Sequence, residues 1–201
     1  MKIKICGLTS PKEAIYLNEN HVDFAGFVLF FPKSKRNITI EKAKEISANL
    51  SSSIKKVAVV VSPTLKQAKE IETAGFDYIQ IHGVMPKELL TNLHIPILKA
   101  FNIDDMEHYS NYVKQPSIAG FVFDAHEPGS GKTFDWNLLR NFPKSDKLIF
   151  LAGGLHPDNV SAAIKAVSPD VVDVSSGVEF DEGAGKDPNK IKAFVEAVRQ
   201  S

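Results

Sequence analysis

The chain has 201 residues, of which 43% are hydrophobic and 24% are charged, so it can bury a large core. Its 24 basic and 24 acidic side chains cancel to a formal net charge of zero, which argues against a nucleic-acid-binding protein and a basic membrane anchor. The single cysteine, Cys6, excludes an intramolecular disulfide and any metal site built from several cysteines.

Short runs of β-branched and aromatic residues recur about every 25 residues along the chain and predict strands. Eight runs have this character: Ile3–Cys6, Phe24–Phe30, Lys56–Val61, Tyr78–His82, Ile97–Phe101, Gly120–Asp124, Leu148–Ala152 and Val171–Ser175. Helix-start signals lie between them, with Ser10 before Pro11 and Glu13 and with Thr39 before Glu41. Further helices are expected to begin near Pro63, Pro86, Asp135, Pro157 and Pro188, and a weaker helical segment runs from Asp104 to Val113.

Eight strands that each precede a helix predict an α/β fold, a single-domain (β/α)8 TIM barrel over residues 1–201. An open doubly wound sheet is the alternative, but such a sheet rarely needs eight evenly spaced units. The apolar runs are far shorter than the roughly 18 residues of a membrane-spanning helix, and the amino terminus has no uninterrupted signal-peptide core. We therefore expect a soluble, cytoplasmic protein with neither a nucleic-acid nor a membrane partner.

Polar residues at the ends of these strands are the first candidates for a site, because TIM barrels place their active sites where strands end. Side chains alternate along a strand, so polar residues two apart share a face. Such sets are Lys4 with Cys6, Gln80 with His82, and Asp173 with Ser175, while Asp124 shares its face with Val122. A cysteine, a histidine and two aspartates are thus expected to converge on one end of the barrel.

Glycines follow the last two predicted strands, at Gly153 and Gly154 and at Gly177 after Ser175 and Ser176. Glycine lets backbone amides approach an anion, and the loops after strands seven and eight are the usual phosphate site of this fold. Glycine turns also commonly follow strands without binding a ligand, but two such loops at these positions favour a phosphate-bearing substrate.

The segment from Gly129 to Thr133 resembles a nucleotide-binding P-loop, yet His126 stands where that motif needs its first glycine. A mobile loop whose Lys132 reaches into the site fits better, and a solvated surface loop is the alternative.

Each candidate side chain also has a possible structural role. Cys6 is either a small buried hydrophobe or a reactive thiol at a catalytic rim. Asp124 is either an ion-pair partner of Lys4 or a capping residue, or it is a general acid or base. His82 can equally be a satisfied core histidine, and the other five histidines show no metal-ligand spacing. Arg36 offers a fork suited to a carboxylate, with Lys33 and Lys35 as solvated neighbours.

Several sequence blocks, in chain order, together resemble phosphoribosylanthranilate isomerase. They are residues 4–9 (KICGLT), 26–28 (GFV), 34–36 (SKR), 80–83 (QIHG), 129–136 (GSGKTFDW), 151–155 (LAGGL) and 172–179 (VDVSSGVE), followed by Lys186 and Asp187. The stretch after Gly83 lacks the acidic pair expected there, and the segment from Asp124 to Gly129 is short. These departures affect loop detail only.

The resemblance implies an isomerase of tryptophan biosynthesis that carries out an Amadori rearrangement of N-(5-phosphoribosyl)anthranilate, with no cofactor and no metal. It implies Cys6 as general base, Asp124 as general acid, and Arg36 as the partner of the anthranilate carboxylate. It implies that the phosphate is bound by Gly153, Gly154, Ser175, Ser176 and Gly177. We also expect His82 and Asp173 to contact the substrate. The partner is thus a small phosphosugar, and the chain would be a monomer or a homodimer. Another phosphosugar-converting barrel enzyme and a non-catalytic phosphometabolite-binding barrel are the alternatives.

Overall fold

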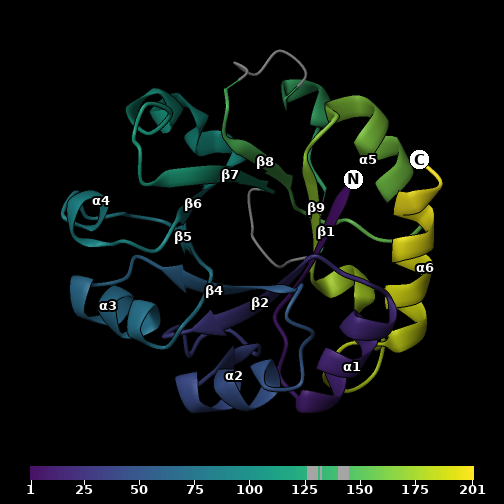
Figure 1. The fold of residues 1–201 in the computed structure, drawn as a ribbon. Helices are drawn as coiled ribbons and strands as arrows, with labels where there is room; N and C mark the ends of the chain where they lie inside the picture. The colour runs from purple at the N-terminus through teal and green to yellow at the C-terminus, as the bar shows by residue number, and fades with distance from the viewer. Residues whose placement is uncertain (126–130, 132, 140–144) are drawn as a thin grey trace.

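The computed structural model describes residues 1–125, 131, 133–139 and 145–201. Within these residues, eight parallel strands close into a barrel, because the first strand pairs with both the second and the last. The barrel strands are β1 (Lys2–Cys6), β2 (Phe24–Leu29), β4 (Lys55–Val61), β5 (Tyr78–His82), β6 (Ile97–Asn102), β7 (Ile118–Asp124), β8 (Leu148–Leu151) and β9 (Val171–Val174). The predicted TIM barrel is therefore confirmed, and Figure 1 shows the strands ringed by helices.

Helices α1 (Pro11–Glu19) and α2 (Ile40–Ser47) begin at the predicted start signals. The Glu13 carboxylate accepts a hydrogen bond from the Ser10 N–H at 3.0 Å, and Thr39 Oγ1 accepts one from the Lys42 N–H at 3.2 Å. Each bond satisfies an amide that the helix leaves unpaired at its amino end. The other α-helices are α3 (Leu65–Thr73), α4 (Leu89–Asn92), α5 (Val160–Val167) and α6 (Pro188–Arg199).

Three segments differ from the expected pattern. The segment expected to be weakly helical is a 3-10 helix, η1 (Ile103–Asn111), and the helix expected near Asp135 is a short 3-10 helix in the described residues, η2 (Trp136–Leu139). A two-residue strand, β3 (Asn37–Ile38), pairs with the end of β2 outside the barrel ring. None of the described helices is both long and apolar enough to cross a membrane.

Alternation along the strands creates two separate cores. Inward-facing residues such as Phe24, Val122, Phe150 and Val171 fill the barrel interior. The larger cluster packs between the outer face of the strands and the helices. Burial on both faces explains why the strands are apolar almost throughout, and why polar residues within them are informative.

Candidate active site

Cys6 and Asp124 end β1 and β7 on the inner face, at the mouth of the barrel, where the carboxyl ends of the strands open. Cys6 is half-buried and lies so close to Gly26 that a Cβ on that glycine would come within 2.9 Å of the Cys6 sulfur. Asp124 is 8% exposed, and its Oδ1 accepts a hydrogen bond from the Ala125 N–H at 2.8 Å. A thiol and a carboxylic acid therefore share one mouth, as acid–base chemistry requires.

A buried ion pair lies just inside the mouth. Lys4 on β1 and Asp173 on β9 are register partners, and Lys4 Nζ lies 2.8 Å from Asp173 Oδ2. The alternative in which Asp124 is the ion-pair partner of Lys4 is therefore wrong, because Lys4 pairs with Asp173. Asp173 Oδ1 is buried and accepts no hydrogen bond from the described residues.

Burial sets the protonation of the two candidate catalytic groups. It raises the pKa of Asp124 to about 6, against the hydrogen bond from Ala125 and with help from the Asp173 charge. It also raises the pKa of the Cys6 thiol above its ordinary value of 9.0, while the Lys4 ammonium acts to lower it. A large part of Asp124 is therefore protonated near pH 6, and Cys6 is mainly a thiol at neutral pH.

His82 ends β5 and is half-buried beside Gln80, with 2.8 Å between the Nε2 atoms of the two side chains. Burial and the charges of Lys4 and Lys99 lower the pKa of His82 to about 3, so the ring is neutral at physiological pH. A neutral imidazole has one N–H donor and one acceptor. His82 can thus hydrogen-bond a ligand at the mouth but is poorly suited to carry a positive charge there.

Arg36, after β2, reaches across to Glu179 after β9, with 2.5 Å between Arg36 Nε and Glu179 Oε1. Lys35 and Lys186 contact the same carboxylate at 2.8 and 3.2 Å. Burial alone would raise the pKa of Glu179, but these cations lower it to about 2. Lys35 is solvated as expected, with 71% of its side chain exposed, and it also pairs with Glu179. Glu179 holds Arg36 against the loop after β1, at Gly7.

The two glycine loops lie against one another and are half-exposed. Gly153 and Gly154 have φ angles of +86° and +62°, which only glycine adopts without strain. A Cβ on Gly177 would overlap the carbonyl oxygen of Leu155, so the β8 and β9 loops touch at backbone distance. Ser175 is held in place, because its hydroxyl donates to the Cys6 carbonyl at 2.9 Å.

The connection after β7 is only partly described. Lys132, Gly129 and Ser130 lie outside the described residues. Gly131 is described, and a Cβ there would lie 3.4 Å from Ser176 Oγ. The connection thus passes over the β9 glycine loop at this point.

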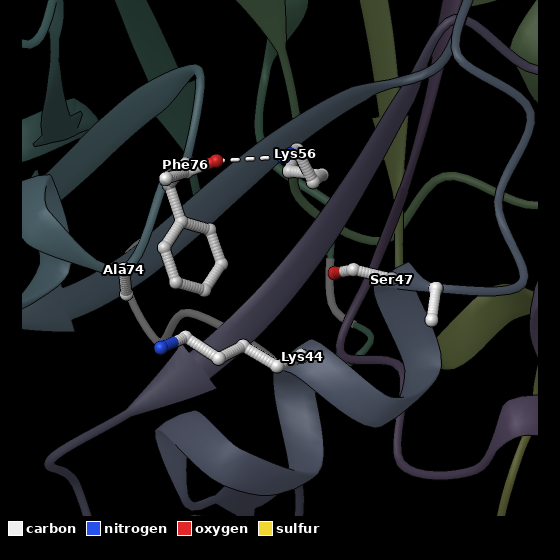
Figure 2. A pocket seen from close by; sticks show the side chains of 7 residues that line it. Lys44, Ser47, Lys56, Ala74 and Phe76 are labelled. Atoms are coloured by element: carbon white, nitrogen blue, oxygen red, sulfur yellow. Dashed lines mark hydrogen bonds between the residues drawn. The ribbon is translucent and has the colours of Figure 1, made fainter.

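A recess of about 240 Å³ lies at the other end of the barrel and is separate from the mouth. The ends of α2 and α3 and the start of β4 form it, and Figure 2 shows the Phe76 ring between Lys44 and Lys56. TIM-barrel active sites lie at the opposite end of the strands, so we assign no part of the reaction to this recess.

Sequence reasoning did not identify the roles of Lys4, Glu179 and Lys186 in the network. Lys4 was placed on the same strand face as Cys6, but its partner Asp173 was not predicted. Lys186 carried no local signal, because its partners Ser175 and Glu179 depend on how the segment before α6 folds back. The Glu13 carboxylate fixes that fold by accepting the Lys186 N–H at 2.7 Å.

Residues 3–197 match the protein family described as N-(5'-phosphoribosyl)anthranilate (PRA) isomerase. The chain belongs to this family. Relatives named N-(5'-phosphoribosyl)anthranilate isomerase include one from Clostridium kluyveri, 41% identical over 201 residues, and one from Streptococcus gordonii, 40% identical over 205 residues. The first alignment covers 99% of this chain and 98% of the relative, and the second covers 98% and 97%. The expected activity, an isomerase of tryptophan biosynthesis, is confirmed at the level of the family.

Solved structures of family members share the fold. The phosphoribosyl anthranilate isomerase of Thermotoga maritima is 34% identical, has a TM-score of 0.89 and is covered over 100% of both chains. A phosphoribosyl anthranilate isomerase solved with reduced 1-(o-carboxyphenylamino)-1-deoxyribulose 5-phosphate is also 34% identical, with a TM-score of 0.85 and 100% of both chains covered. Another Thermotoga maritima structure, 34% identical with a TM-score of 0.87 and 100% of both chains covered, is described as monomers generated from a dimeric enzyme.

Proposed function

We propose that this chain converts N-(5-phosphoribosyl)anthranilate to 1-(2-carboxyphenylamino)-1-deoxyribulose 5-phosphate, with Cys6 as general base and Asp124 as general acid. The observation that carries the proposal is the placement of a thiol and a largely buried carboxyl on one barrel mouth, above the Lys4–Asp173 pair. The catalytic unit is the barrel of residues 1–201. The family match supports this reaction over that of another phosphosugar barrel enzyme.

Ring opening is the first step and needs a proton on the ribose ring oxygen. Protonated Asp124 donates that proton, the bond between the ring oxygen and C1' breaks, and the nitrogen lone pair forms an iminium. A pKa of about 6 keeps part of Asp124 protonated near neutrality, as this role demands.

Proton abstraction is the second step. The iminium makes the hydrogen on C2' acidic, and the Cys6 thiolate removes it to leave an enolamine, with the electron pair moving to the nitrogen. The enolamine then tautomerises to the ketone, so atoms and electrons balance without a redox partner. That the reaction uses no cofactor and no metal ion stays a prediction.

Substrate binding is divided between two parts of the mouth. The half-exposed backbone at Gly153, Gly154, Ser175, Ser176 and Gly177 is proposed to hold the phosphate. Arg36 is proposed to bind the anthranilate carboxylate, with Glu179 fixing its guanidinium by the bond at Nε. His82 and Asp173 are proposed to contact the sugar. The relative solved with a reduced product analogue supports a small phosphosugar ligand.

The activity is tested by generating phosphoribosylanthranilate in situ and following its anthranilate-type fluorescence. Adding the protein should make the fluorescence decay at a rate proportional to protein concentration. A folded protein that leaves the signal at its background rate would refute the proposed reaction and favour a non-catalytic binding barrel. The oligomeric state is a separate question, for which a dimeric relative supports the homodimer.

The pH dependence of kcat/KM should be bell-shaped, with its rising limb centred near pH 6. The productive form has ionised Cys6 and protonated Asp124, but the pKa of the thiol lies above 9.0 and that of Asp124 at about 6. Between these values the productive fraction is constant. Below pH 6 Asp124 is fully protonated, so the productive fraction falls with the thiolate concentration. Above the thiol pKa Cys6 is fully ionised, so the productive fraction falls as Asp124 loses its proton. A rising limb above pH 8 would contradict this order of the two pKa values.

Arg36→Met should weaken product binding by about 10- to 100-fold, because a hydrogen bond to a charged group contributes about 1.5–3 kcal/mol. Fluorescence titration with the product measures the change. Lys33→Met is the matched control, since Lys33 is an exposed cation on the same loop and should leave the affinity unchanged. Equal product affinity in Arg36→Met and the wild type would place Arg36 outside the binding site.

A further inference from the structure

The Lys4–Asp173 ion pair is almost fully buried, although burying two charges costs free energy of folding. The two side chains are 0% and 5% exposed, and removing two charges from water costs several kcal/mol for each ion. A well-packed apolar pair of similar volume is often as stable or more stable. Stability therefore does not explain why the barrel interior holds this pair directly below the mouth.

The orientation of the pair relates it to both candidate catalytic groups. Lys4 lies two residues before Cys6 on the same face of β1, and its ammonium interacts with the thiol. Along β7, β8 and β9, Val122, Phe150 and Val171 are register neighbours. Two residues further along their strands, Asp124 and Asp173 occupy the next inward-facing layer. The cation thus lies toward the base and the anion toward the acid.

One of the two oxygens of the Asp173 carboxylate has no hydrogen-bond partner among the described residues. Lys4 contacts Oδ2, and the oxygen without a partner is the buried Oδ1. In a poorly solvated interior, such a carboxylate acts on nearby titratable groups with little screening.

We propose that the Lys4–Asp173 pair positions the protons of the active site, its ammonium favouring the Cys6 thiolate and its carboxylate favouring the protonated form of Asp124. This inference rests on the assignment of Cys6 as base and Asp124 as acid in the proposed function. Lys4 and Asp173 act through these two groups and are positioning residues. A direct contact of Asp173 with the sugar is compatible with this role.

The effect of the pair on protonation follows from the two pKa values. Burial raises the pKa of Cys6, and Lys4 opposes this more strongly than Asp173 supports it. Burial also raises the pKa of Asp124, and there the Asp173 charge outweighs that of Lys4. Lys4 thus lowers the higher pKa, that of the base Cys6, and Asp173 raises the lower pKa, that of the acid Asp124. The difference between the two pKa values becomes smaller. Each pKa unit of narrowing increases the productive fraction about tenfold.

Other charges also face these groups and must be separated in a test. Lys186, from the segment before α6, is a second cation near Cys6, and its Nζ contacts Ser175 O at 3.0 Å and Glu179 Oε1 at 3.2 Å. His82 on β5 is neutral at physiological pH. Neither is altered in the variants below, so a shift in the thiol titration belongs to the ion pair.

The decisive experiment measures the rate of iodoacetamide alkylation against pH, because Cys6 is the only thiol in the chain. Lys4→Met should raise the pH of half-maximal alkylation by about 1 to 3 units, the range for loss of a nearby opposite charge. Lys99→Met is the matched control. Lys99 is a buried lysine whose Nζ bonds the Gly83 and Ala100 carbonyls on the outer side of the barrel wall, and its loss should leave the thiol midpoint in place.

A second variant covers failure of the first to fold, since Lys4→Met leaves Asp173 buried and unpaired. The double variant Lys4→Met/Asp173→Asn removes both charges and should still show a raised thiol midpoint, because Lys4 has the larger effect on Cys6. Folding is checked by circular dichroism. An unchanged midpoint in a folded variant that lacks Lys4 would overturn the proposal.

The acid is tested with Asp173→Asn, by NMR titration of labelled aspartate carboxyls. The Asp124 signal is identified by its loss in Asp124→Asn, and its pKa should fall below about 6 in Asp173→Asn. An unchanged or higher value would overturn this half of the proposal. Neither titration requires turnover. If Cys6→Ala remained fully active, the proposed function would fail, whereas the alkylation and NMR titrations would still decide whether the ion pair shifts the two pKa values.

Discussion

Replacing Cys6 by Ala, or Asp124 by Asn, should each lower kcat by about 10²- to 10⁴-fold, the usual contribution of a positioned base or acid. Product affinity should change little, because both groups act mainly in the transition state. The double variant should lose less than the product of the two single losses. The acid and the base serve consecutive steps of one reaction, so the loss of either group already blocks turnover and the second loss adds little.

The exposed Asp158, whose side chain is 94% accessible, provides a matched control for Asp124. Asp158→Asn should retain wild-type kcat, which shows that the loss in Asp124→Asn is specific to the mouth. Near-normal turnover in Cys6→Ala would make Cys6 a small buried hydrophobe and direct the search for the base to Asp173 or His82. If both single variants fold, bind product and turn over normally, the proposed mechanism is wrong.

Gly177→Ala should raise KM by about 10- to 100-fold and lower kcat by less. A Cβ at this position would overlap the Leu155 carbonyl oxygen, so the β8 and β9 loops would have to separate. Overpacking of this kind costs about 1–3 kcal/mol, and here the cost falls on the proposed phosphate-binding backbone. Inhibition by inorganic phosphate should weaken in parallel, and steady-state kinetics with and without phosphate measure both effects.

Gly75→Ala separates binding from stability. Gly75 lies at the far end of the barrel with a φ of +80° and open space around it, so alanine there strains the backbone without touching the mouth. That variant should unfold at a lower temperature yet keep its KM. If Gly177→Ala is folded and its KM is unchanged, the phosphate does not bind at the β9 loop.

The barrel could be predicted from the sequence because its signals are local. Apolar runs such as Ile97–Phe101 and cap residues such as Ser10 and Thr39 act over a few neighbouring residues, and the structure places strands and helices there. The helical segments in the middle of the chain were the least well predicted, both the weak one around Asp104 and the helix expected near Pro86. The segment around Asp104 is a 3-10 helix, and α4 spans only four residues. Short helical segments depend on packing more than on propensity.

The positions of the candidate site residues could also be predicted, because strand ends in a closed parallel barrel meet at one mouth. Cys6 and Asp124 both lie there. The family could be predicted from sequence motifs that lie in order along the whole chain. The resemblance therefore led to the family that the full-length comparison shows.

Only the tertiary structure decided which charges meet. Lys4 had Asp124 as a possible partner in the sequence, but barrel closure aligns β1 with β9 and pairs it with Asp173, 169 positions away. In the same way, Glu179 joins Arg36 across 143 positions. Neither partner can be read from local spacing, because strand register sets the contact. Burial then sets the pKa values, since the cost of a charge depends on the atoms that surround it and not on its neighbours in the chain.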